Sequence, residues 1–335
     1  MKIIYTILKR LGYLVPTLFG LIILTFFIAY YIPANPEAAV AGPFADAAQI
    51  AKINEKYGFD QPVPVQLWRY LKRLVHGDLG ESLYSHREIS TEIFNRFPAT
   101  LELVFFSLIL SILFGIPVGV ISAVKRNTLF DHVLRAITIS GIALAVFWIG
   151  IEFQLLLGYK AKLFPITGRI QGPSPEGITG FYVLDSILTL NASALWGSLR
   201  SLALPILALG IGPFATIVRL TRAGVLNTLN SDYVIYERAM GFRRRVLIFK
   251  YVLRNALTST ISQIGLLFGY MLASGFVVER VFSWPGMGTF AVESILMMDY
   301  NAVLGVAIWT GIAYSVGNLM ADILLIFVDP REISK

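Results

Sequence analysis

The chain contains no cysteine, and its 335 residues include only three histidines. Without cysteine, disulfides, thiolate metal sites and thiol catalysis are all excluded. The histidines (His76, His86 and His132) are widely spaced and belong to no metal-binding motif. The sequence therefore predicts no metal site in this chain.

Common motifs for nucleotide binding and hydrolysis are also missing. No G-x-x-x-x-G-K-[ST] phosphate loop, G-x-S-x-G nucleophile elbow or H-E-x-x-H zinc motif occurs. The glycines of "GIGPFA" (210–215) lie in an apolar run, where close helix packing explains them better than phosphate binding. We therefore expect a protein without catalytic residues and without its own ATPase activity.

Charged residues are scarce, at 15% of the chain, whereas 56% of the residues are hydrophobic and the mean hydropathy is +0.69. Soluble domains carry about 25% charged residues, so this composition indicates a membrane protein. A helix needs about 20 mostly apolar residues to cross a bilayer. We predict an all-α integral membrane protein with six transmembrane helices, at about 11–32, 101–124, 133–158, 199–220, 258–282 and 302–328.

Lysine and arginine in the short loops predict the orientation, because such loops stay on the cytoplasmic side. These residues precede the first span and follow the second, fourth and sixth (Lys2, Lys9, Arg10, Lys125, Arg126, the block 219–254, Arg331 and Lys335). With six spans, all of these positions lie on one side of the membrane. Both termini are therefore predicted to be cytoplasmic.

This topology divides the chain into four parts. Residues 1–32 form the cytoplasmic N-terminus and the first helix, and residues 33–100 form a large extracytoplasmic segment. Residues 101–328 form a five-helix core that includes a cytoplasmic loop at 221–257. Residues 329–335 form a cytoplasmic tail.

The few ionisable residues that we assign to the spans lie near the membrane interfaces. Arg135 and Glu152 lie near the two ends of the third span, and Asp322 lies near the inner end of the sixth. An ion-coupled secondary carrier more often places an acid in the middle of the membrane. That class is therefore disfavoured and is kept as the alternative from a different functional class.

The positive charge is concentrated in one loop. Residues 219–254 hold eight Arg or Lys and two acids, a net charge of +6 out of +7 for the whole chain. Because apolar spans flank this block on both sides, we assign it to a membrane-protein loop and expect no nucleic-acid partner.

The loop carries the signals of a short helix. Ser231 or Asp232 suits the N-cap. Tyr233, Tyr236 and Met240 recur at three- and four-residue spacing, which predicts one narrow apolar stripe.

A turn and a second helix are predicted to follow. Gly241 suits a left-handed helix end, and residues 243–255 can form a second helix that leads into the fifth span. The resulting hairpin has three possible roles. It could lie on anionic lipid, cap the bundle, or insert its apolar stripe into a groove on a soluble partner.

The loop resembles the cytoplasmic EAA loop of ABC importer permeases, specifically the dipeptide/oligopeptide/nickel family. The matching residues are "DY" (232–233), "ERAMG" (237–241) and "LRNAL" (253–257). The similarity covers roughly residues 1–332 and includes "GDLGESL" (77–83), "IFNRFPATLEL" (93–103), "FGIPVGVISAVKRN" (114–127), "LPILALGIGPFATIVRLTRAGVL" (204–226), "VFSWPGMGTFAVESILMMDY" (281–300) and "DPRE" (329–332).

The chain departs from the family pattern at two places. Ile235 stands where the general pattern has Glu, and Thr258 and Ser259 follow "RNAL" where the family often has a Pro nearby. The outer stretch 175–198 also contains a glycosylation sequon at Asn191.

The resemblance implies a permease subunit in the plasma (inner) membrane, in contact with membrane lipids. It further implies a second homologous permease subunit, two cytoplasmic ATPase subunits that bind ATP and Mg, and an extracytoplasmic solute-binding protein. Peptides are the expected cargo, with oligosaccharides or nickel complexes as alternatives. The residues expected to couple to the ATPases are Tyr233, Tyr236, Glu237, Ala239, Met240, Gly241, Phe242, Arg243, Arg244 and Arg245. The residues expected at an outer gate or binding-protein contact are Trp284, Pro285, Gly286 and Tyr300.

Overall fold

The computed structural model of the chain describes residues 12, 15–27, 46, 48, 50, 51, 55 and 61–328, without the side chains of residues 300, 322 and 324–328. In this part of the chain every regular element is a helix, and the one β contact is an isolated bridge between Glu81 and Glu88. The all-α prediction is therefore confirmed there. The tail 329–335, with its "DPRE" match, lies outside the described residues, as does most of the stretch 33–60 of the predicted segment 33–100. The location of the termini therefore stays a prediction.

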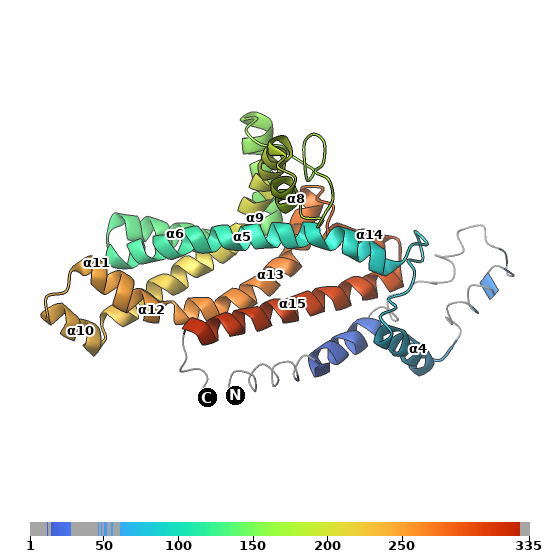
Figure 1. The fold of residues 1–335 in the computed structure, drawn as a ribbon, viewed down its shortest axis with the longest axis horizontal. Coiled ribbons are helices and arrows are strands. Elements are labelled where there is room, and N and C mark those ends of the chain that lie inside the picture. The colour runs from blue at the N-terminus through green and yellow to red at the C-terminus, as the bar shows by residue number, and fades with distance from the viewer. Residues whose placement is uncertain are drawn as a thin grey trace.

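Among the described helices, four are long and apolar enough to cross a membrane. They are α5 (Ile89–Val124), α9 (Ala192–Leu229), α13 (Thr258–Val281) and α15 (Tyr300–Val328). Figure 1 shows α5, α13 and α15 running lengthwise through the molecule. At 1.5 Å per residue, α5 and α9 are each more than about 50 Å long, whereas the hydrocarbon core of a bilayer is about 30 Å thick. Both helices therefore continue beyond the predicted spans into the segments expected to be loops.

The prediction of one continuous third span is wrong. The chain forms α6 (Leu129–Ala143) and then α7 (Val146–Phe153), which continues into the π-helical segment η1 (Gln154–Lys160), with a bend of 107° between the two parts. Leu144 and Ala145 have extended backbone at the bend. In this orientation α7 packs against the end of α13, where Gly150 lies next to Val281 and Phe282.

The described residues do not confirm the predicted count of six transmembrane helices. The described residues contain the four long helices and the bent pair, which together make at most five spans. A shorter apolar helix, Val15–Phe27, covers the middle of the first predicted span, and the rest of that span lies outside the described residues.

The centre of the fold is the contact between α5 and α9, which packs closely through small residues. A Cβ atom on Gly115 would lie 2.8 Å from Ile217, and one on Gly119 would lie 2.8 Å from Thr221. Small residues at such positions let two helix backbones approach in a membrane. In addition, the Ser111 hydroxyl donates to the carbonyl of Gly210 at 3.0 Å.

Shorter helices lie at the two opposite ends of this bundle (Figure 1). One end carries α10 (Asp232–Ala239), α11 (Arg244–Val246) and α12 (Leu253–Ala256). The other end carries α14 (Met287–Leu296) and α4 (Val63–Val75), while α8 (Tyr182–Leu188) precedes α9. Asn191, the asparagine of the predicted sequon, caps α9 by accepting a hydrogen bond from the Ala194 amide at 3.0 Å.

Candidate functional site

The predicted cytoplasmic loop forms a helical hairpin at one end of the bundle (Figure 1). Its first arm is α10 (Asp232–Ala239). Its second arm consists of α11 (Arg244–Val246), the π-helical segment η2 (Leu247–Val252) and α12 (Leu253–Ala256), which follow one another directly. The second arm therefore ends two residues before α13 begins.

The ends of the first arm lie where the sequence predicts them. Ser231 occupies the N-cap position, although its hydroxyl donates to the Thr228 carbonyl at 2.6 Å and does not cap α10. Gly241 has φ +82°, the left-handed conformation that glycine adopts without strain. Its amide donates to the Arg238 carbonyl at 3.1 Å, which closes the end of α10.

Buried apolar side chains anchor the hairpin to the bundle. Val120 and Ala123 of α5 and Val225 of α9 form one buried cluster with side chains from both arms. Full burial of one such aliphatic side chain stabilises by about 1.5–3 kcal/mol. The hairpin is therefore fixed to the ends of α5 and α9 through Val234, Leu247, Ile248 and Val252.

The opposite side of the hairpin exposes an apolar ridge, which we define as Tyr233, Tyr236, Met240 and Phe242. These side chains are 40%, 66%, 64% and 44% exposed. A group of large exposed apolar side chains marks an interaction surface.

The ridge is held in place by contacts between the two arms. The Tyr233 hydroxyl accepts a hydrogen bond from the Asn255 side-chain amide at 2.7 Å. The ring of Phe242 packs edge-on against Tyr251, with centroids 5.6 Å apart. Both ridge residues therefore have a defined position relative to the second arm, which leads into α13.

The charge around the ridge is positive. Arg243, Arg244 and Arg245 are exposed, and no described residue forms an ion pair with them or with Arg238. Glu237 forms no ion pair within the described chain either, and one of its carboxylate oxygens is shielded from solvent without a hydrogen-bond partner there. The surface beside the ridge is thus available to a partner that carries negative charge.

A buried ion pair ties α9, near the base of the hairpin, to the first turn of α6. Asp131 is fully buried and accepts hydrogen bonds from Arg222 of α9 at 2.7 and 2.9 Å. It also accepts from the Ser122 hydroxyl at 2.6 Å and from the Asn127 amide at 3.1 Å. The nearby Arg135 was predicted near the membrane interface, whereas Asp131 was not predicted as a functional residue; the available signal was its place between several basic residues.

At the other end of the bundle, Glu279 of α13 is fully buried and organises the segment "SWPGMG" (283–288). Its carboxylate accepts from the Thr100 hydroxyl at 2.6 Å and from the amides of Gly288 and Thr289 at 2.7 and 3.2 Å. A Cβ atom on Gly286 would lie 2.4 Å from this carboxylate. The glycine thus lets the turn close over a buried acid.

Another buried acid, Glu102 of α5, forms an ion pair with Arg169. The Arg169 guanidinium donates to Glu102 at 2.6 and 3.1 Å and lies 3.8 Å from the centroid of the Tyr182 ring. Glu102 also accepts from the Val183 amide at 2.7 Å. This pair holds the loop before α8 against α5.

The first turn of α8 contains a further carboxylate, Asp185, which accepts hydrogen bonds from Ile178, Thr179 and Gly180 of the preceding loop. Burial raises the pKa of the Asp185 carboxyl, but these hydrogen bonds together outweigh burial and hold the pKa below its usual value. Asp185 therefore remains ionised at neutral pH.

The residues predicted at an outer gate lie in different environments. Trp284 is completely buried, and its indole N–H donates to the Ala99 carbonyl at 2.9 Å. Gly286 is buried as well, whereas Pro285 is exposed. The observed contacts of Trp284 and Gly286 are internal, and their assignment to an outer gate or a binding-protein contact stays a prediction. The side chain of Tyr300 lies outside the described part.

Comparison with known proteins agrees with this architecture. Residues 115–334 match the family model described as "Binding-protein-dependent transport system inner membrane component", and residues 3–104 match the corresponding N-terminal model. The chain is 38% identical to a probable D,D-dipeptide transport system permease protein of Escherichia coli K12, over 96% of each chain. It is 35% identical to a dipeptide transport system permease protein of Alkalihalophilus pseudofirmus, over 97% of this chain and 98% of that protein.

A third relative is a glutathione transport system permease protein of Salmonella paratyphi A, which is 33% identical over 97% of each chain. These matches cover nearly the full length, and the apolar helices indicate a multi-pass membrane protein. The chain therefore belongs to the family of inner membrane components of binding-protein-dependent transport systems.

Proposed function

We propose that this chain is the permease subunit of an ATP-driven importer and forms half of a pathway for small peptides. Family membership supports the importer, and the transport of dipeptides or glutathione by relatives supports peptide cargo. An extracytoplasmic binding protein delivers the peptide, and a second homologous permease completes the pathway. Six spans with both termini in the cytoplasm give the hairpin access to two ATPase subunits, which bind ATP and Mg.

The observation that carries this proposal is the hairpin with its exposed apolar ridge and unpaired arginines. The ridge inserts into a groove on an ATPase subunit, in the way that an apolar helix face docks into a partner. Because Val234, Leu247, Ile248 and Val252 anchor the hairpin, a displacement of the ridge is transmitted to α5 and α9. ATP then shifts the equilibrium between two packed states through contacts that differ between them.

Site-directed cross-linking tests this contact, and the absence of native cysteine makes the labelling specific. Met240→Cys places a thiol on the ridge. Leu129→Cys places a thiol at an exposed position of α6, outside the hairpin, and is the matched control. In membranes of the native host, a short thiol-directed cross-linker should join Met240→Cys to an ATPase subunit and leave Leu129→Cys uncoupled.

Equal cross-linking of both variants, or capture of lipid alone by Met240→Cys, contradicts docking on an ATPase. Purification of the tagged chain without any ATPase in several mild detergents contradicts the importer assignment itself. In that case an ion-coupled carrier is the remaining candidate, and the basic block becomes a lipid anchor.

A further inference from the structure

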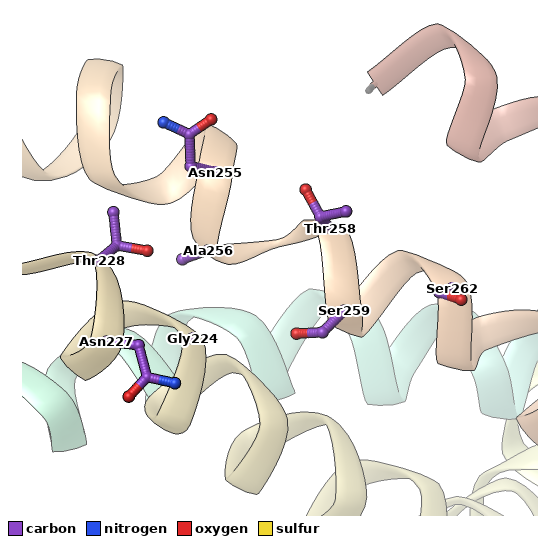
Figure 2. A pocket seen from close by; sticks show the side chains of 8 residues that line it. All are labelled: Gly224, Asn227, Thr228, Asn255, Ala256, Thr258, Ser259 and Ser262. Carbon is purple, nitrogen blue, oxygen red and sulfur yellow. The ribbon is translucent and has the colours of Figure 1, made fainter. Parts of the chain in front are cut away.

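A polar groove lies where the end of α9 meets α12 and the start of α13, next to the coupling hairpin. It has a volume of about 430 Å³. Figure 2 shows Asn227 and Thr228 on one wall, and Asn255, Thr258 and Ser259 on the other. Gly224, Ala256 and Ser262 complete the lining.

The lining of this groove is uncharged, although the groove lies within the most basic part of the chain. None of its eight residues is ionisable, whereas the surrounding loop 219–254 carries a net charge of +6. Six of the eight have an amide or hydroxyl side chain, and these groups both donate and accept hydrogen bonds. The groove can therefore bind a polar molecule without selecting its charge.

Most polar side chains in the groove have no hydrogen-bond partner among the described residues. The side chains of Asn227, Thr228, Thr258, Ser259 and Ser262 make no hydrogen bond to any described residue. In contrast, Ser107, Ser111 and Thr216 elsewhere in the long helices each donate to the carbonyl four residues earlier. Asn227, Ser259 and Ser262 are exposed, so their polar groups are open to a molecule within the groove.

The shape of the groove depends on close packing at one point. A Cβ atom on Gly224 would lie 2.4 Å from the carbonyl oxygen of Ala256, so α9 and α12 touch there through their backbones. α12 ends at Ala256, and α13 begins at Thr258. This contact fixes the spacing of the two walls.

The open face of α13 continues from the groove into the bundle. Ser259 and Ser262 are exposed on this helix, and Tyr270 follows at 55% exposure, about two turns farther along. A Cβ atom on Gly212 of α9 would lie 4.0 Å from the Tyr270 hydroxyl, so the two helices remain close at that level. Exposed hydroxyl groups on a spanning helix indicate a face that meets something other than lipid.

We infer that this groove is the cytoplasmic exit of the transport pathway and that its free amide and hydroxyl groups bind the backbone of the departing peptide. The inference rests on the proposed function as a peptide importer. Every peptide offers the same backbone N–H and C=O groups, so an uncharged lining accepts peptides whose side chains differ. Binding at an exit must also be weak enough for release, and neutral hydrogen bonds are weaker than charge-assisted ones.

Asn255 links the groove to the apolar ridge of the hairpin. Asn255 lines the groove and also donates to the hydroxyl of Tyr233 on the ridge, at 2.7 Å. A partner that displaces Tyr233 therefore also displaces one wall of the groove. This connection gives the ATPase cycle a direct route to the exit.

The test uses the whole complex, with its binding protein, in proteoliposomes, and single cysteines in a chain that has none. Asn227→Cys and Ser262→Cys place thiols in the groove. Asn230→Cys is the matched control, because it is an exposed asparagine only three residues from Asn227 that does not line the groove. A charged, membrane-impermeant thiol reagent is applied from the cytoplasmic side, with and without a dialanine peptide (L,L or D,D) and ATP.

We expect peptide and ATP together to slow labelling of both groove cysteines at least twofold, and labelling to abolish most uptake. Asn230→Cys should react at the same rate in all conditions and keep its uptake. If the groove cysteines react without protection and uptake survives, the exit assignment is wrong while the importer assignment stands. If the unlabelled complex takes up neither peptide, the proposed function fails and the exit assignment fails with it.

Discussion

The buried pair of Glu102 and Arg169 makes a quantitative prediction about stability. Their side chains are 1% and 7% exposed, and the shortest distance between the charged groups is 2.6 Å. In Arg169→Met, the Glu102 carboxylate would keep only its hydrogen bond from the Val183 amide. Removing one partner of a buried ion pair costs about 3–5 kcal/mol, because the other charge stays buried without compensation.

The double variant Glu102→Gln/Arg169→Met should recover part of this loss. A neutral amide costs less to bury than an unpaired carboxylate, and the Gln side chain can still accept from the Val183 amide. The two substitutions should therefore be non-additive by about 1–3 kcal/mol, the range expected for residues in direct contact.

The free energy of unfolding can be measured by titrating the purified chain with a denaturing detergent in mixed micelles. The matched control is Arg280→Met, because Arg280 and Glu293 are 55% and 48% exposed and lie 3.9 Å apart. Exposed pairs contribute about 0–1 kcal/mol. Equal destabilisation by Arg169→Met and Arg280→Met, or strict additivity in the double variant, would refute the reasoning.

Three further outcomes follow from single residues. Gly241→Asp should abolish ATP-dependent uptake and leave membrane insertion intact, whereas Gly241→Asn, which also tolerates the left-handed backbone, should keep most uptake, because only the Asp places a negative charge among the arginines. Asp185→Asn should lower stability at neutral pH. A carboxyl with a depressed pKa stabilises the fold above its unfolded pKa of about 3.9 and loses this contribution as the pH falls through its folded value, so the difference from the wild type should shrink in thermal unfolding below about pH 4. Gly286→Ala should lower the unfolding temperature, because its Cβ would meet the Glu279 carboxylate at 2.4 Å, whereas Gly177→Ala has open space and should not.

The local features of the hairpin could be predicted from the sequence because neighbouring residues determine them. Gly241 adopts the left-handed conformation just after α10. The three- and four-residue spacing of Tyr233, Tyr236 and Met240 places these exposed side chains on one side of the first arm. The resemblance also pointed to the transport family that the comparisons show. That these residues contact an ATPase stays a prediction.

The bend in the third predicted span could not be seen in the sequence. An apolar stretch of sufficient length predicts a span, but α7 turns away by 107° and packs on the end of α13. A Cβ atom on Gly150 would lie 3.2 Å from the Phe282 ring, a contact between residues far apart in the chain. The direction of α7 is thus associated with tertiary packing and not with a proline or a polar break.

The buried acids were missed for a similar reason. The partner of Glu102 is 67 residues away, and Thr100, which donates to Glu279, is 179 residues away in the sequence. Glu102 and Glu279 both lie near the ends of predicted spans, where a charged side chain is expected to be exposed to solvent. Likewise, Trp284 precedes a Pro-Gly turn, which suggested a surface contact, but the Ala99 carbonyl satisfies its indole N–H in the interior.

The central claim is that this chain works as the permease of an ATP-driven peptide importer. The most direct measurement is uptake of a radiolabelled dipeptide by the complex purified through a tag on this chain and reconstituted in proteoliposomes with its binding protein. The account predicts uptake that requires ATP and the binding protein and that persists when ion gradients are dissipated. Uptake that follows a proton or sodium gradient without ATP would contradict it.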